Sequence, residues 1–140
     1  MSVYLDASVL VALFTNDPFT RRADDFLRRE MPTLAVSDFA RAEFASAVSR
    51  RVRTGELTVD EAREAFSVLD VWTARAVRRI TTSSADVAAA TAYLRRLDLT
   101  LRTADALNIA IAERIGCTLL TFDRKMAESA QAIGLSIAAG

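Results

Sequence analysis

The sequence predicts an α/β fold: an α/β/α sandwich with a central parallel sheet of four or five short strands, formed by a single domain over residues 1–140. Short apolar segments alternate along the chain with longer amphipathic ones, which is typical of a parallel sheet covered by helices on both faces. Of the 140 residues, 51% are hydrophobic, enough for one core. Only four Gly and two Pro occur, which argues against disorder.

The first half of the chain is punctuated by residues that start and stop helices. Pro18 suits the first turn of a helix, Pro32 ends that helix, Ser37 is a candidate N-cap, and Gly55 closes the helix that Ser37 begins. The elements expected here are a strand at 3–5, helices at 8–16 and 18–30, a strand at 34–36 and a helix from Ser37 to Arg53.

In the second half, Thr58 and Glu61 form a capping box that opens a helix with apolar residues at helical spacing. Thr103 is expected to cap a later helix that stops at Gly116. The remaining expected elements are a short strand at 79–81, a helix at 84–97, a strong strand at 118–122, a helix at 124–133 and a last strand at 135–137.

Composition excludes several classes of enzyme. The chain has no His, which removes Ser-His-Asp and Cys-His nucleophilic systems and His-ligated zinc. The single cysteine, Cys117, excludes an internal disulfide and zinc sites that need several thiolates. The formal net charge is zero, so overall charge does not indicate a nucleic-acid binder. With no apolar run of about 20 residues and no signal-peptide pattern, we expect a cytoplasmic protein.

Four acids interrupt segments that otherwise look buried. Asp6 and Asp123 end predicted strands, Glu43 lies early in the helix after the second strand, and Asp105 lies in an almost wholly apolar helix. Ligands of parallel sheets bind beyond the carboxyl ends of the strands, which is where Asp6 and Asp123 fall. Burying ionised carboxylates costs several kcal/mol each unless a counter-charge is present. Because oxygen ligands favour Mg²⁺ or Mn²⁺ over zinc, the pattern predicts a site for one of these ions.

Each acid also has an ordinary structural interpretation. Asp6 and Asp123 can act as N-caps of the helices that follow them. Asp105 can be a first-turn acid favoured by the helix dipole, and Glu43 can form a surface pair with an Arg. All four interpretations would have to hold at once, so we favour the metal site.

Three polar residues are candidates for supporting roles. Ser8 and Thr121 lie two positions from Asp6 and Asp123, and residues two apart in an extended segment share a face. Their hydroxyls can orient a carboxylate or hold a water; the alternatives are a helix cap for Ser8 and strand propensity for Thr121. Asn108, one turn after the acid of its helix, is interpreted either as an aid to substrate or ligand binding or as a buried, satisfied amide.

Four features in order along the chain resemble the PIN domain and, within it, the VapC-type toxins of bacterial toxin–antitoxin systems. They are V-Y-L-D-A-S-V-L at the N-terminus, Glu43 within a helix, T-A-D-A-L-N-I-A-I-A, and L-L-T-F-D-R-K near the C-terminus. The resemblance covers nearly the whole chain. It implies a Mg²⁺- or Mn²⁺-dependent ribonuclease with a PIN-like α/β/α fold, homodimerisation, and inhibition by a small DNA-binding antitoxin.

By motif position, the family's catalytic and metal-binding acids correspond to Asp6, Glu43, Asp105 and Asp123. The expected activity is endonucleolytic cleavage of RNA phosphodiesters by metal-activated water, with in-line attack that leaves a 5′-phosphate and a 3′-hydroxyl. The partners that the resemblance implies are an RNA substrate, a cognate antitoxin protein and a second copy of the chain.

The sequence allows two other functions. One is a catalytically silent partner-binding module of the same fold. Its amphipathic helices, which carry Phe19, Phe26, Phe66 and Trp72, could form a groove for a partner helix. For most of these aromatic residues, plain core packing is the favoured interpretation. The other is a phosphotransfer enzyme with Asp6 as nucleophile. It ranks low for two reasons. Ser8 stands where haloacid-dehalogenase-like phosphatases carry a second Asp. Response-regulator receivers need paired acids after the first strand and a Lys after a separate late strand, but here Lys125 directly follows the last acid.

Overall fold

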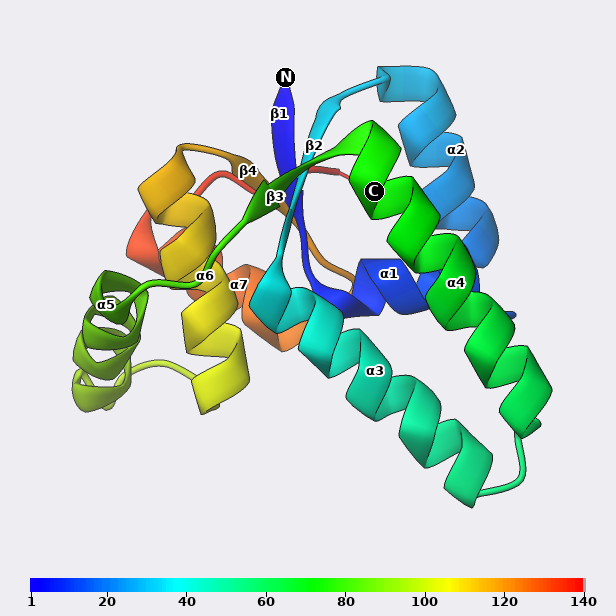
Figure 1. Cartoon of the computed structure of the whole chain (residues 1–140). Coiled ribbons are helices and arrows are strands. Elements are labelled where there is room, and N and C mark those ends of the chain that lie inside the picture. Colours follow the sequence, from blue (N-terminus) through cyan, green and yellow to red (C-terminus); the bar gives the residue numbers. More distant parts are fainter. Residues whose placement is uncertain (140) are drawn as a thin grey trace.

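A four-stranded, all-parallel sheet forms the centre of the molecule in the computed structural model, which describes residues 1–139 (Figure 1). The sheet order is β3-β2-β1-β4, and Val3 of the central strand pairs with Leu34 on one side and Thr118 on the other. The strands are β1 (Ser2–Leu5), β2 (Thr33–Ser37), β3 (Val77–Ile80) and β4 (Thr118–Leu120). The expected sandwich is therefore confirmed, with four strands.

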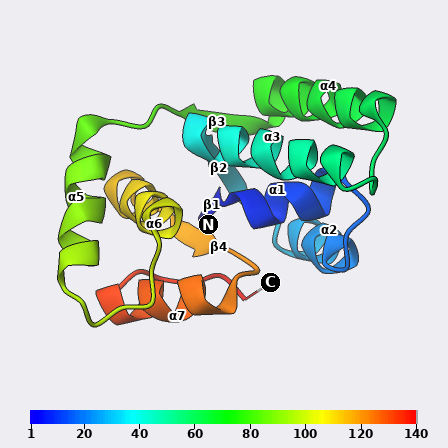
Figure 2. The ribbon, with the colours of Figure 1, turned by 90° about the horizontal axis from the view of Figure 1, so that it is seen from below.

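Helices cover both faces of the sheet. Figures 1 and 2 show α1 to α4 on one side and α5 to α7 on the other. The helices are α1 (Ala7–Phe14), α2 (Thr20–Glu30), α3 (Asp38–Arg53), α4 (Val59–Ala76), α5 (Ser84–Arg95), α6 (Thr103–Ile115) and α7 (Arg124–Ile133). Within residues 1–139, none of these helices is long and apolar enough to cross a membrane.

The core has two halves because strand side chains alternate between the faces. Val3 and Leu5 of β1 pack with Phe44 of α3 on the side of α1 to α4. Tyr4, between them, packs with Ile109 of α6 on the opposite side. Burial on both faces explains why the inner strands β1 and β2 are almost continuously apolar, whereas the edge strand β3 carries two exposed arginines, Arg78 and Arg79.

Several helix ends lie where the local signals predict them. Ser37 caps α3 by accepting a hydrogen bond from the backbone N–H of Ala40 at 2.9 Å. The capping box of Thr58 and Glu61 opens α4. Gly116 ends α6 with a φ of 70°, in the left-handed region that favours glycine.

Other boundaries differ from the sequence-based expectation. Arg102, not Thr103, is the N-cap of α6, and Thr103 is its first residue. The fourth strand ends at Leu120, so Thr121 already lies in the turn. The predicted strand at 135–137 is wrong: only an isolated parallel bridge joins Ile137 to the sheet. Such edge contacts depend on where the chain returns after α7, which local pattern does not encode.

The connections place two strand ends at a topological switch point. After β1 the chain crosses to the face covered by α1 and α2, whereas after β4 it enters α7 on the opposite face (Figure 2). Since β1 and β4 are neighbours, a crevice is expected between their carboxyl ends. The first and last of the candidate acids lie at this edge.

Candidate active site

Asp6 follows β1 directly, and the residue is only 5% exposed. Its Oδ1 accepts hydrogen bonds from the Ser8 hydroxyl at 2.6 Å and from the backbone N–H of Val9 at 3.3 Å. Its Oδ2 accepts one from the Thr121 hydroxyl at 2.5 Å. Asp6 thus caps α1, as one interpretation predicted, and is also held between β1 and the turn after β4.

The same hydroxyls bind the β4–α7 turn. Ser8 Oγ accepts the backbone N–H of Phe122 at 3.0 Å, and Thr121 Oγ1 accepts that of Asp123 at 3.1 Å. Asp123 in turn caps α7, because its Oδ1 accepts the N–H of Met126 at 3.2 Å. Ser8 and Thr121 therefore join the two strand ends, and Ser8 is not a helix cap.

Glu43 is brought to the site through Asn108. The Asn108 amide donates to Glu43 Oε1 at 2.7 Å and to the carbonyl of Ala104 at 3.0 Å, while its Oδ1 accepts the Tyr4 hydroxyl at 2.5 Å. The Tyr4 hydroxyl also contacts Ser37 Oγ at 2.7 Å. Asn108 is therefore the buried, satisfied amide that one interpretation predicted, and it also orients a candidate ligand.

Tyr4 is the site residue that sequence reasoning missed. Burial raises its pKa above the ordinary value, so its hydroxyl stays protonated and can donate. The available signal was its position: Tyr4 lies two residues before Asp6, so the two share a face of the extended segment. A phenol on an otherwise aliphatic strand needs a polar partner.

The electrostatics of the site are unfavourable for two carboxylates. Burial raises the pKa of Asp6 to about 6, although hydrogen bonds from Ser8 and Thr121 oppose the shift. Burial also raises the pKa of Glu43 to about 7; the Asn108 amide opposes this, and the charges of Asp6 and Asp105 add to it. No salt bridge in residues 1–139 supplies either carboxylate with an Arg or Lys partner. A counter-cation would relieve this repulsion.

The other two acids lie at helix N-termini on the same edge. Asp105 Oδ2 accepts the backbone N–H of Arg102 at 3.1 Å, so it occupies the first-turn position that the dipole favours. In the part of the chain described, no three Asp, Glu or Cys side chains lie together closely enough to hold a metal ion. The donor chemistry does fit Mg²⁺ or Mn²⁺, since every candidate ligand is a carboxylate and Asp6 is flanked by the hydroxyls of Ser8 and Thr121.

Fold and site together define a parallel α/β domain with two carboxylates, Asp6 and Asp123, at its topological switch point. The chain belongs to the PIN domain family, whose model matches residues 3–131. Ribonuclease VapC46 of Mycobacterium tuberculosis is 30% identical to it over 141 residues, 99% of this chain and 97% of that protein. This family assignment removes the reason for the phosphotransfer alternative.

Two solved structures have the same fold. VapC20 of Mycobacterium tuberculosis, described as a sarcin-ricin loop cleaving toxin, superposes with a TM-score of 0.76 at 19% identity and covers 97% of this chain and 98% of its own. VapBC2 from Rickettsia felis, bound to a DNA fragment from its promoter, gives a TM-score of 0.68 at 20% identity, with 98% and 96% covered. At these identities the likeness concerns the fold.

Proposed function

We propose that this PIN domain is a metal-dependent endoribonuclease, the toxin of a toxin–antitoxin pair, in which Asp6, Glu43, Asp105 and Asp123 hold Mg²⁺ or Mn²⁺. The observation that carries the proposal is the burial of Asp6 and the partial burial of Glu43 at the carboxyl edge of the sheet, where no salt bridge within residues 1–139 gives either a basic partner. A divalent cation is the counter-charge that such a pair of oxygen ligands favours. The ribonuclease name of the 30% identical relative supports the activity.

Each residue has a distinct task in this proposal. When bound, a divalent ion supplies Lewis-acid chemistry: it activates water for in-line attack and offsets negative charge on the RNA phosphate. Ser8 and Thr121 keep both oxygens of Asp6 in place. Asn108 directs the Glu43 carboxylate. Asp105 and Asp123 complete the acidic edge from the N-termini of α6 and α7, where positive helix-dipole charge favours carboxylates.

The proposed partners are an RNA substrate, a cognate antitoxin protein and a second copy of the chain, in the cytoplasm. The antitoxin is supported by fold neighbours solved as toxin–antitoxin complexes, including VapBC2. The expected products of water attack are a 5′-phosphate and a 3′-hydroxyl, whereas attack by the ribose 2′-hydroxyl leaves a 2′,3′-cyclic phosphate. Analysis of the fragment ends separates these two reactions.

The direct test is cleavage of total RNA by the purified chain with Mg²⁺, with Mn²⁺ and with EDTA. We expect cleavage only with a divalent ion, and loss of cleavage in Asp6→Asn and Asp105→Asn. Asp60→Asn is the matched control, because Asp60 is a first-turn acid of α4 outside the site. Full activity in Asp6→Asn, or cleavage in EDTA, would contradict the proposal. Partner binding without cleavage of any RNA would instead support a catalytically silent module.

A further inference from the structure

One aromatic side chain does not join the core. Phe26 is buried in the core, and Phe66 and Trp72 pack against it, as core packing predicts. Phe19 instead remains 39% exposed, in the turn before α2. Because part of this ring faces solvent, its contacts and its position determine what it can bind.

Phe19 lies in a stacked arrangement with a second ring and an arginine. The Phe19 and Phe122 rings are 5.0 Å apart between centroids and tilted by only 11°. The guanidinium carbon of Arg22 lies over both rings, 5.8 Å from the Phe19 centroid and 5.2 Å from the Phe122 centroid. The exposed Phe19 ring, the partly buried Phe122 ring and a planar cation therefore lie together.

This stack adjoins the candidate active site. Phe122 is the residue between Thr121 and Asp123, and its backbone N–H donates to Ser8 Oγ at 3.0 Å. The same Ser8 hydroxyl donates to Asp6 at 2.6 Å. The turn that holds the Asp6 carboxylate in place thus also carries one of the two rings.

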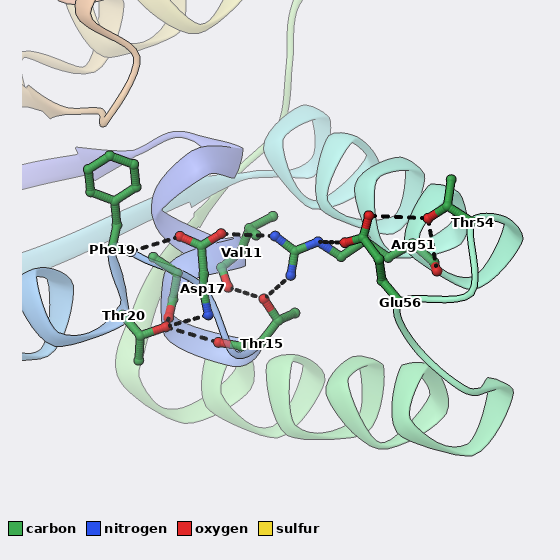
Figure 3. A network of polar contacts seen from close by, with 9 residues as sticks. Val11, Thr15, Asp17, Phe19, Thr20, Arg51, Thr54 and Glu56 are labelled. Carbon is green, nitrogen blue, oxygen red and sulfur yellow. Dashed lines mark hydrogen bonds and ion pairs between the residues drawn. The ribbon is translucent and has the colours of Figure 1, made fainter.

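The loop with Phe19 is held in place by the network in Figure 3. Asp17 Oδ2 accepts the backbone N–H of Phe19 at 3.0 Å, and Asp17 Oδ1 pairs with Arg51 of α3 at 2.9 Å. Arg51 also donates to Thr15 Oγ1 at 2.8 Å. Figure 3 shows the Phe19 ring on the side of Asp17 away from Arg51, outside the polar network. A ligand at this ring meets an ordered loop, which lowers the entropic cost of binding.

We propose that Phe19, Phe122 and Arg22 form a stacking site for a nucleobase of single-stranded RNA that flanks the phosphate to be cut. Every base offers a π-face to an aromatic side chain, and an arginine plane can stack on a base or contact its phosphate. The location beside Asp6 favours RNA over a protein partner as the occupant. This inference rests on the proposed ribonuclease function.

The test measures binding of two fluorescein-labelled probes by anisotropy: a 12-mer of adenosine nucleotides and a ribose-phosphate 12-mer without bases. The protein is the full chain with Asp6→Asn, in Mg²⁺, so that the RNA is bound without being cut. We expect Phe19→Leu in this background to weaken binding of the adenosine probe about tenfold, which is within the range for loss of one base–aromatic stack. The abasic probe should bind both proteins equally.

Two further variants separate stacking from folding. Phe19→Trp keeps an aromatic face, so it should restore adenosine binding even if Phe19→Leu lowers the melting temperature. Arg22→Lys keeps the positive charge but loses the planar guanidinium, so it should weaken binding of the adenosine probe severalfold. Arg21→Lys is its control, since Arg21 lies on the same helix and lines a different hollow with Asp24 and Arg28.

Kinetics of the otherwise unaltered chain give an independent readout. A base stacked equally before and during the reaction contributes to binding alone, so Phe19→Leu should raise KM severalfold with little change in kcat. If Phe19→Leu weakens binding of both probes equally, or leaves adenosine binding unchanged, the stacking site is overturned. Phe19 would then be assigned to contact with a protein partner. If the unaltered chain cleaves RNA and Phe19→Leu cleaves it with the same KM and kcat, only this inference is refuted. Phe19-dependent RNA binding without any cleavage refutes only the proposed function.

Discussion

Asn108 donates its amide to Glu43 at 2.7 Å, although the two residues are 65 positions apart in the sequence. The Tyr4 hydroxyl sets the direction of this bond, because it donates to the Asn108 carbonyl oxygen and leaves only the NH₂ group to face Glu43. A buried tyrosine of β1 therefore positions a candidate ligand on α3 through a side chain of α6. The amide favours the ionised form of Glu43 against the effect of burial.

Tyr4→Phe tests this positioning role. The change leaves the buried carbonyl oxygen of Asn108 without its donor, which should cost about 1–3 kcal/mol of unfolding free energy. We expect metal-dependent cleavage to fall severalfold, less than in Asp6→Asn, because Glu43 stays present but loses its fixed partner. Tyr93→Phe is the control, since that hydroxyl bonds Glu113 away from the site. Unchanged stability and activity in Tyr4→Phe would show that the hydroxyl is dispensable.

Glu43→Gln should stabilise the metal-free protein at pH 8. Burial and the charges of Asp6 and Asp105 disfavour the ionised carboxylate, whereas Gln keeps an acceptor for Asn108 without the charge. At pH 5, below the pKa of about 7 for folded Glu43, the gain should disappear. Thermal melts in EDTA at both pH values measure this difference. A fall in melting temperature of similar size at pH 5 and pH 8 would contradict it, while cleavage should be lost in either case.

The unaltered protein should show the matching pH dependence. The pKa of Asp6 rises from 3.8 to about 6 on folding, and that of Glu43 from 4.5 to about 7. Between these values the folded chain keeps protons that the unfolded chain has released, so the contribution of these two groups to metal-free stability should fall as pH rises from about 4 to about 7 and then level off.

Added Mg²⁺ should therefore raise the melting temperature more at pH 8 than at pH 5, because it binds the deprotonated carboxylates. Melts in EDTA and in Mg²⁺ across this pH range test both trends. A Mg²⁺ effect of the same size at pH 5 and pH 8 would exclude these two carboxylates as its ligands.

Asp123 combines two tasks that a pair of variants can separate. Asp123→Ala removes the acceptor for the N–H of Met126 and should lower stability by about 1 kcal/mol, the usual value of an N-cap. Asp123→Asn keeps a capping oxygen and should retain most of the stability. Both should lose metal-dependent cleavage if Asp123 is a metal ligand. Full cleavage by a stable Asp123→Asn would restrict the residue to its role as a cap.

Local signals accounted for most of the fold. Ser37 and the box of Thr58 and Glu61 cap helices through hydrogen bonds that span three residues, so the sequence alone predicts them. The end of β4 at Leu120 was missed because hydrogen bonds of the β4–α7 turn, including that of Thr121 with Asp123, take over beyond it. The expected strand at 135–137 failed because it makes only one bridge to the sheet.

By itself, the sequence determined that the chain is a parallel α/β domain and that Asp6 and Asp123 lie at the edge where its ligands bind. Apolar periodicity and strand-end position are local properties, and they carry this information. Only the tertiary structure decided that Tyr4 holds Asn108, that Thr121 holds Asp6, and that Phe19 stacks on Phe122. Each of these pairs joins residues about a hundred positions apart, and only the packing of helices against strands brings them into contact.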